Sequence, residues 1–193
     1  NDSSYPYTLE MPNHSFLKYC SDVYSQNGED GILQQLLKEL DIKEGFCCEF
    51  GAYDGVVSSN TLNLIEANDF TSLQIEGDPH KYELLRRNMS RFPKVFTENC
   101  FISIEPNTET SLDKLLEKHK FPYNFDVLSI DIDRDDYFVW KNFTKFRPKI
   151  VIIETNSYRD PIVEETPLEK AYQNTTDPLA HWCPLRVQMG SSF

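Results

Sequence analysis

The stretch Phe46-Cys47-Cys48-Glu49-Phe50-Gly51-Ala52-Tyr53-Asp54-Gly55 decides the fold class of this chain. Its first half has the composition of a short buried strand, and its second half is a turn that contains two glycines. A glycine turn directly after a strand lets the backbone approach a ligand closely, as it does in nucleotide-binding folds. The turn lacks the GxGxxG pattern, and acidic residues flank its glycines. This chemistry favours a ligand with an amino group or a positive centre over a pyrophosphate.

A second acidic position lies one strand further along. The segment 71–75 is predicted to be a strand, and Glu76 stands at its carboxyl end, 22 residues after Asp54. In nucleotide-binding folds an acidic side chain at about this distance accepts the ribose hydroxyls. The turn and Glu76 together predict a nucleoside site. The alternative interpretation is a tight turn followed by an ordinary helix cap.

Strands and helices alternate along most of the chain. Turn residues and the spacing of apolar residues predict helices at 29–40, 58–68, 79–89, 111–119 and 135–146, and strands at 46–50, 71–75, 95–97, 125–132 and 149–154. Such alternation builds right-handed crossovers between parallel strands. The predicted fold class is therefore α/β, a doubly wound, mostly parallel sheet with helices on both faces.

The composition excludes several classes of protein. The 193 residues are 39% apolar, which is enough for one domain with a real core. The formal net charge of -12 disfavours generic binding to nucleic acid or to anionic membranes. No run approaches the length of about 20 apolar residues that a membrane span needs.

The cysteines favour a reducing compartment. The chain has five cysteines and no CxxC pair, and Cys47 and Cys48 lie in an apolar run, where they are expected to be small buried hydrophobes. We therefore expect a cytoplasmic protein. Asn-x-Ser/Thr sequons at Asn1, Asn13, Asn88, Asn142 and Asn174 count against that expectation.

Several motifs, in order along the chain, resemble one known family. Glu49–Gly55 and Gln74–Asp78 look like motif I and the acidic loop of class I S-adenosylmethionine-dependent methyltransferases. Four further segments resemble the FkbM-like branch of that family: Tyr24–Leu33, Ser59–Thr61, Leu128–Asp133 and Arg147–Glu154. The resemblance covers residues 24–156.

This resemblance implies a Rossmann-like O-methyltransferase that uses S-adenosyl-L-methionine to methylate a hydroxyl of a sugar, a glycan or another small metabolite. It implies the strand order 3-2-1-4-5. We expect an N-terminal arm at 1–24, the methyltransferase domain at 25–156 and a lid or loop region at 157–193. The residues expected to bind the cofactor, with Glu76 on its ribose, are Gln26, Glu49, Gly51, Ala52, Asp54, Gly55, Asn60 and Glu76.

Acidic residues also follow the fourth and fifth predicted strands, where the ligand crevice of an open parallel sheet lies. Asp131 and Asp133 are the predicted catalytic residues, acting on the acceptor hydroxyl. Asp131, Glu154 and Asn156 are candidate ligands of magnesium, a cation that prefers oxygen ligands and acidifies a bound hydroxyl. The neighbouring Asp135 and Asp136 have an alternative interpretation: they open the following helix, whose N-terminus favours acidic residues without any catalytic role.

Two features depart from the FkbM-like pattern. Arg134 stands where the family has glycine, and the chain ends at Phe193, before the antiparallel hairpin that completes the family's sheet. We therefore expect the last strands to be missing. An unpaired strand at 149–154 would be an aggregation hazard, which favours a truncated chain or a covering partner. Two alternatives to the methyltransferase stay open: a nucleotide-sugar-dependent enzyme on a related fold, and a non-catalytic interaction module that retains the fold.

Overall fold

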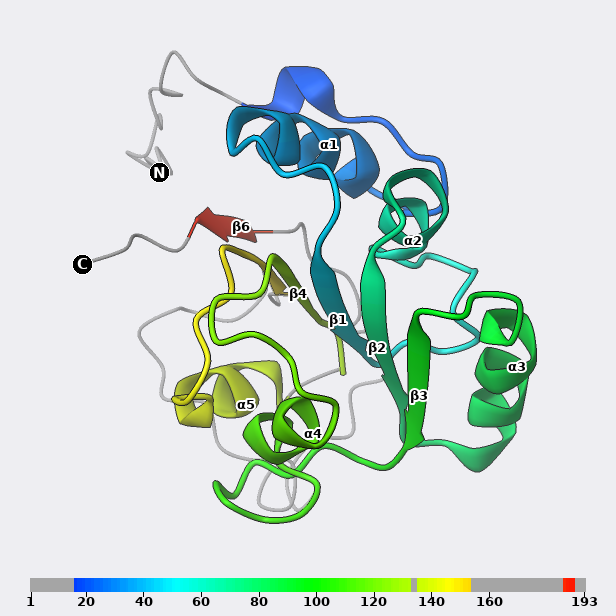
Figure 1. The fold of residues 1–193 in the computed structure, drawn as a ribbon, viewed down its shortest axis with the longest axis vertical. Helices are drawn as coiled ribbons and strands as arrows, with labels where there is room; N and C mark the ends of the chain where they lie inside the picture. The colour runs from blue at the N-terminus through cyan, green and yellow to red at the C-terminus, as the bar shows by residue number, and fades with distance from the viewer. Residues whose placement is uncertain (1–15, 133–134, 154–185, 190–193) are drawn as a thin grey trace, which may run out of the picture.

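The fold is built on one mixed sheet. A computed structural model describes residues 16–132 and 135–153, and the strand 186–189 by its backbone alone. The strands are β1 (Phe46–Phe50), β2 (Thr71–Glu76), β3 (Val95–Asn99), β4 (Val127–Ile130), β5 (Ile150–Ile153) and β6 (Arg186–Met189). Their order is β3-β2-β1-β4-β5-β6, and all neighbours are parallel except β5 and β6 (Figure 1). The order 3-2-1-4-5 that the resemblance implied is confirmed.

The helices that accompany these strands are α1 (Glu29–Glu39), α2 (Leu62–Asn68), α3 (Pro79–Met89), α4 (Leu112–Lys118) and α5 (Asp136–Asn142), and a short 3-10 turn, η1 (Phe16–Tyr19), precedes them. Two helices, α2 and α5, are shorter by more than one turn than the sequence predicts. α2 starts late because Ser58 has a left-handed backbone, with φ 58°, and the residues after it bond to β1. α5 stops at Asn142 because Phe143 is extended. None of the described helices is long and apolar enough to cross a membrane.

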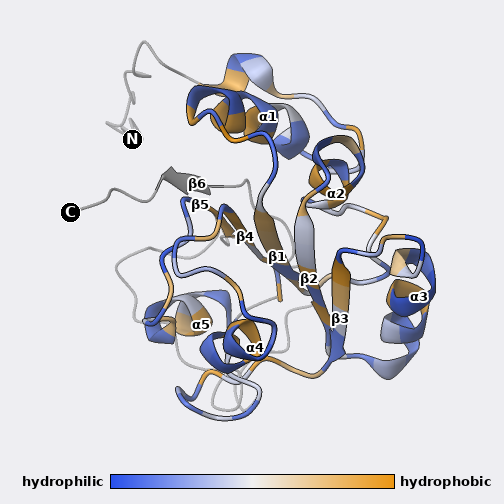
Figure 2. Cartoon of the chain, in the orientation of Figure 1, coloured by the Kyte–Doolittle hydropathy of each residue, from blue (hydrophilic) through white to orange (hydrophobic). Residues whose placement is uncertain are grey.

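Different helices cover the two faces of the sheet. Side chains alternate along a strand, so Cys47 and Cys48 point to opposite faces, and both are completely buried. The core on the side of Cys47 is formed with α1, α2 and α3, and the core on the side of Cys48 with α4 and α5. Figure 2 shows that these helices mix hydrophobic and hydrophilic residues, as amphipathic helices do. The prediction of helices on both faces is confirmed.

The expectation that the last strands are missing is wrong for the strand next to β5. β6 pairs antiparallel with all four residues of β5, from Ile150 opposite Met189 to Ile153 opposite Arg186. The pairing satisfies backbone groups of a strand that would otherwise be an aggregation hazard. A four-residue strand far along the chain from its partner has too short a pattern for sequence analysis to detect. The domain limits at 24 and 156 stay a prediction.

Helix α3 begins at Pro79, shortly after Glu76 at the end of β2. Its N-cap is Asp78, whose Oδ1 accepts the backbone N–H of His80 at 2.7 Å and of Lys81 at 3.1 Å. These bonds, that of Lys81 foremost, lower the pKa of Asp78, because they favour its charged form. The cap therefore fixes the start of α3 next to the end of β2.

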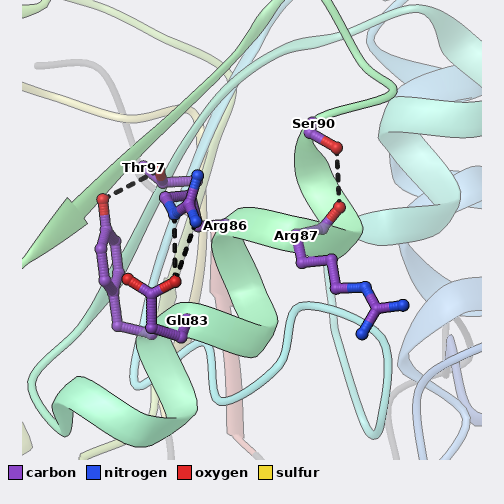
Figure 3. Close-up of polar contacts among 6 residues, drawn as sticks. Glu83, Arg86, Arg87, Ser90 and Thr97 are labelled. Carbon is purple, nitrogen blue, oxygen red and sulfur yellow. Dashed lines mark hydrogen bonds and ion pairs between the residues drawn. The ribbon is translucent and has the colours of Figure 1, made fainter.

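The middle of α3 is held against the edge strand β3. The Tyr82 hydroxyl lies 3.3 Å from Oγ1 of Thr97 on β3. On the same helix Glu83 and Arg86 form an ion pair at 2.9 Å (Figure 3). The ion pair is exposed and contributes little, so burial of Leu85 and Met89 supplies most of the packing energy of α3.

Candidate functional site

The glycine turn after β1 brings the backbone of β1 against the end of β4. Gly51 has φ +75°, and a Cβ atom there would lie 1.6 Å from the carbonyl oxygen of Asp131. Both the backbone conformation and the lack of space therefore require glycine. The N–H of Gly55 closes the turn by donating to the carbonyl oxygen of Ala52 at 2.8 Å. The predicted cofactor turn is a tight structure at the carboxyl edge of the sheet.

Glu76 is buried at the end of β2, beside this turn. Its Oε2 accepts the backbone N–H of Tyr53 at 2.9 Å, and its Oε1 accepts that of Asp78 at 2.7 Å. The amide of Asn99 on β3 donates to the carbonyl oxygen of Glu76 at 2.8 Å. A carboxylate oxygen can accept two hydrogen bonds, so each oxygen retains capacity for a hydroxyl. The structure thus presents Glu76 with its orientation already set.

Glu49 is the centre of a buried hydrogen-bond network. Its carboxylate accepts the Ser59 hydroxyl at 2.8 Å, the Asn60 backbone N–H at 2.8 Å and the Thr61 hydroxyl at 2.6 Å. Burial raises the pKa of Glu49, an effect that these hydrogen bonds oppose and the charge of Asp131 reinforces. The side chain therefore holds the segment 59–61 against β1, and its contact with a cofactor stays a prediction.

The Glu49 network extends to both neighbours of β1. Nδ2 of Asn60 donates to the Ser129 hydroxyl on β4 at 3.1 Å, and Nε2 of Gln74 on β2 donates to Oγ1 of Thr61 at 2.8 Å. All four side chains are buried. The quoted motifs 59–61, 74–78 and 128–133 contain Asn60, Thr61, Gln74 and Ser129, but nothing in the sequence indicated that these side chains bond to one another. The network ties the loop after β1 to three adjacent strands.

Asp54 and Gln26 shape the loop that follows the glycine turn. Oδ1 of Asp54 accepts the backbone N–H of Val56 at 2.9 Å and of Val57 at 2.8 Å, which is a local turn. The Ser58 hydroxyl donates to Oε1 of Gln26 at 3.3 Å. The segment before α1 thus reaches the loop after the glycine turn. Binding of a cofactor by either side chain stays a prediction.

A buried aspartate outside the predicted site anchors the segment before α1. Oδ2 of Asp30 accepts the backbone N–H groups of Val23, Tyr24 and Ser25 at 2.8 to 2.9 Å. Three bonds to one oxygen make Asp30 the residue that holds residues 23–25 in place. Its position within Tyr24–Leu33, a quoted motif, was the signal that could have found it.

Asp131 lies at the end of β4, beside the glycine turn. Its N–H donates to the carbonyl oxygen of Phe50 at 3.3 Å, and its side chain is partly buried. Three predicted residues lie outside the part of the chain that the structure describes: Asp133, Glu154 and Asn156. Within residues 16–132 and 135–153, no group of three His, Cys, Asp or Glu side chains could hold a metal ion. The magnesium site therefore stays a prediction.

Two exposed aromatic rings near Glu76 were absent from the predicted site. Phe101, two residues after β3, is 75% exposed, and a Cβ atom on Gly77 would lie 2.3 Å from its ring. The ring therefore lies directly against Gly77. Tyr53, inside the glycine turn, is 41% exposed. Phe101 is an apolar residue shortly after a predicted strand, and this position was the signal that could have identified it as part of the site.

No protein-family model matches this chain, and no curated protein matches it significantly. Among solved structures it is similar to M. capricolum TrmK in complex with S-adenosyl-homocysteine, at 16% identity and a TM-score of 0.44, over 65% of this chain and 51% of that one. A putative RNA methyltransferase from Pyrococcus horikoshii matches at 19% identity and a TM-score of 0.40, over 67% and 61%. A putative O-methyltransferase from Klebsiella pneumoniae matches at 16% identity and a TM-score of 0.49, over 78% and 69%.

The chain thus spans about half the length of TrmK. The fold class of this chain follows from its own topology: the order of the strands, the helices on both faces of the sheet and the glycine turn after β1. This is a doubly wound, Rossmann-like α/β fold with the strand order that the resemblance implied.

Proposed function

We propose that this chain is an S-adenosyl-L-methionine-dependent methyltransferase. One observation carries the proposal: the buried carboxylate of Glu76 lies beside a turn that requires glycine at position 51. Backbone N–H groups already orient both oxygens of that carboxylate. An oriented carboxylate with spare lone pairs suits the two hydroxyls of a ribose. A glycine turn suits close approach of the attached amino-acid portion.

The described residues fit this cofactor. Glu76 would accept the ribose hydroxyls, and the backbone of Gly51–Gly55 would line the methionine portion. The exposed ring of Phe101 against Gly77 offers an apolar surface to the adenine. When bound, the cofactor supplies a methyl group on a sulfonium, from which the neutral thioether S-adenosyl-homocysteine is an excellent leaving group. The protein then mainly has to align the acceptor with this methyl group.

For the acceptor we propose a hydroxyl of a sugar, a glycan or another small metabolite. Asp131 lies at the carboxyl end of β4, at the switch point between β1 and β4 where ligands bind in open parallel sheets. Its carboxylate would orient the acceptor hydroxyl and hold the proton that the oxygen loses on methylation. Asp133 is the second proposed catalytic residue. The net charge of -12 favours a neutral or cationic acceptor over an anionic one.

Calorimetric titration with S-adenosyl-L-methionine and S-adenosyl-homocysteine, each with and without magnesium chloride, tests the proposal. We expect both to bind the wild type, and Glu76→Ala to weaken binding at least about tenfold, because it removes hydrogen bonds to a charged group. Glu83→Ala is the matched control, since it removes an exposed carboxylate from α3, and its affinity should equal that of the wild type. Tighter binding with magnesium would support the site at Asp131, Glu154 and Asn156.

Absence of binding by a folded sample would contradict the methyltransferase. A parallel titration with UDP-glucose then separates the two alternatives. Binding of UDP-glucose would favour the nucleotide-sugar-dependent enzyme, and binding of none of these ligands would favour the non-catalytic module.

A further inference from the structure

We propose that the ring of Tyr53 recognises the positive charge of the sulfonium and so sets the preference of the site for S-adenosyl-L-methionine over its uncharged product, S-adenosyl-homocysteine. This inference rests on the proposed function and adds charge recognition to it. Three observations on Tyr53 support it: its backbone conformation, its place in the site and the cation beside its ring.

Tyr53 occupies a backbone conformation that favours glycine. Its φ is +51°, and it lies between Gly51 and Gly55, which have φ +75° and +74°. A left-handed backbone is strained for a tyrosine, and residues in this state cluster at functional sites. Glycine would adopt this backbone conformation without strain. The presence of tyrosine therefore indicates that its side chain has a function.

The backbone of Tyr53 places the residue between the two portions of the proposed cofactor. Its N–H donates to Oε2 of Glu76 at 2.9 Å, and Glu76 is the proposed ribose ligand. The residue also belongs to the turn that would line the methionine portion. In S-adenosyl-L-methionine the sulfur atom joins the ribose to that portion. Tyr53 therefore belongs, by its backbone, to the part of the site where the sulfonium would lie.

The ring of Tyr53 already contacts a cation. Nζ of Lys81 lies 5.0 Å from the ring centroid, within the distance of about 6 Å at which cation–π attraction operates. Lys81 comes from the first turn of α3, where Asp78 accepts its backbone N–H at 3.1 Å. An aromatic ring has two faces, and Tyr53 is 41% exposed, so surface remains for a second cation.

The test compares Tyr53→Gly and Tyr53→Phe with the wild type. Calorimetry gives the dissociation constants of S-adenosyl-L-methionine, of S-adenosyl-homocysteine and of sinefungin, which carries an ammonium in place of the sulfonium. Glycine suits the left-handed backbone, so Tyr53→Gly removes the ring without forcing the turn to rearrange. Phenylalanine keeps the ring and removes only the hydroxyl.

We expect Tyr53→Gly to lower the preference for S-adenosyl-L-methionine over S-adenosyl-homocysteine by about threefold to thirtyfold, the range of a cation–π contact. Sinefungin should lose affinity in parallel with S-adenosyl-L-methionine, and Tyr53→Phe should change the preference by less than about twofold. An unchanged preference in Tyr53→Gly, with both ligands still bound, would overturn the inference alone. Failure of the wild type to bind either ligand would overturn the proposed function, and the inference with it.

Discussion

Replacing Gly51 by alanine tests whether the turn after β1 depends on the absence of a side chain. The added Cβ would lie 1.6 Å from the carbonyl oxygen and 2.7 Å from the carbonyl carbon of Asp131. Both are backbone atoms, so the clash is relieved only if β1 and the end of β4 move apart. That movement stretches the hydrogen bond from the Asp131 N–H to the carbonyl oxygen of Phe50.

The expected cost combines three effects. The left-handed conformation disfavours alanine by about 1–2 kcal/mol. Relief of the overlap costs about 1–3 kcal/mol, as overpacking does elsewhere, and the weakened backbone hydrogen bond about 1 kcal/mol. Together these place Gly51→Ala at a loss of about 3–6 kcal/mol in the free energy of unfolding, at the upper end for a single substitution.

Gly55→Ala is the matched control. Gly55 has nearly the same backbone conformation, with φ +74°, but its Cβ would meet Cδ1 of Leu85 and Cε of Met89, both at 2.7 Å. These are the ends of flexible side chains that can shift, so we expect a loss of only about 1–3 kcal/mol. Urea unfolding followed by circular dichroism measures both variants. A loss in Gly51→Ala no greater than that in Gly55→Ala would refute the reasoning.

Three further predictions concern buried groups. Asp30→Ala should lower the free energy of unfolding by about 3 kcal/mol in a urea titration, because three backbone N–H groups lose their acceptor, and a loss below about 1 kcal/mol would contradict this. The pKa of Glu49 is raised above 4.5 in the native state, so the native carboxyl keeps its proton where the unfolded one loses it. The stability of the wild type relative to Glu49→Gln should therefore fall as the pH rises from 4.5 to the native pKa, and a difference independent of pH would count against the burial of this charge. Burial raises the pKa of Cys47 to about 12 and that of Cys48 well above its usual value, whereas Cys20 is exposed. Iodoacetamide followed by peptide mass spectrometry should find Cys20 modified in the folded protein and Cys47 and Cys48 only after unfolding.

Much of the fold could be predicted because its signals are local. The strand Phe46–Phe50 and the start of α3 at Pro79 lie where the sequence places them, since strand composition and a proline at the first helical position act within a few residues. Apart from the missed strand β6, the errors lie at the boundaries of helices and strands. The segment 58–61 has apolar spacing compatible with a helix, but the bonds of Ser59 and Asn60 to Glu49 outweigh that weak preference.

The candidate site was predictable in part. Gly51 and Glu76 could be singled out because each follows a strand, and parallel strands end at a common edge of the sheet. The partners of these residues could not be predicted. Glu49 turns out to hold the segment 59–61, and Phe101 lies against Gly77, because both arrangements depend on contacts across neighbouring strands.

The sequence by itself determined the type of each helix and strand from α1 to β5, the α/β class and, through the motif resemblance, the order of the first five strands. The periodicity of apolar residues and the positions of glycine and proline affect structure within a few residues, so their effect can be predicted from the sequence alone. Only the tertiary structure decided that β6 pairs with β5 and that the carboxylate of Glu49 bonds within a buried network. It also decided that Tyr53 lies beside both Glu76 and Lys81. Such pairings join residues that are distant along the chain. Burial and hydrogen-bond geometry select them only once the sheet has brought its loops together.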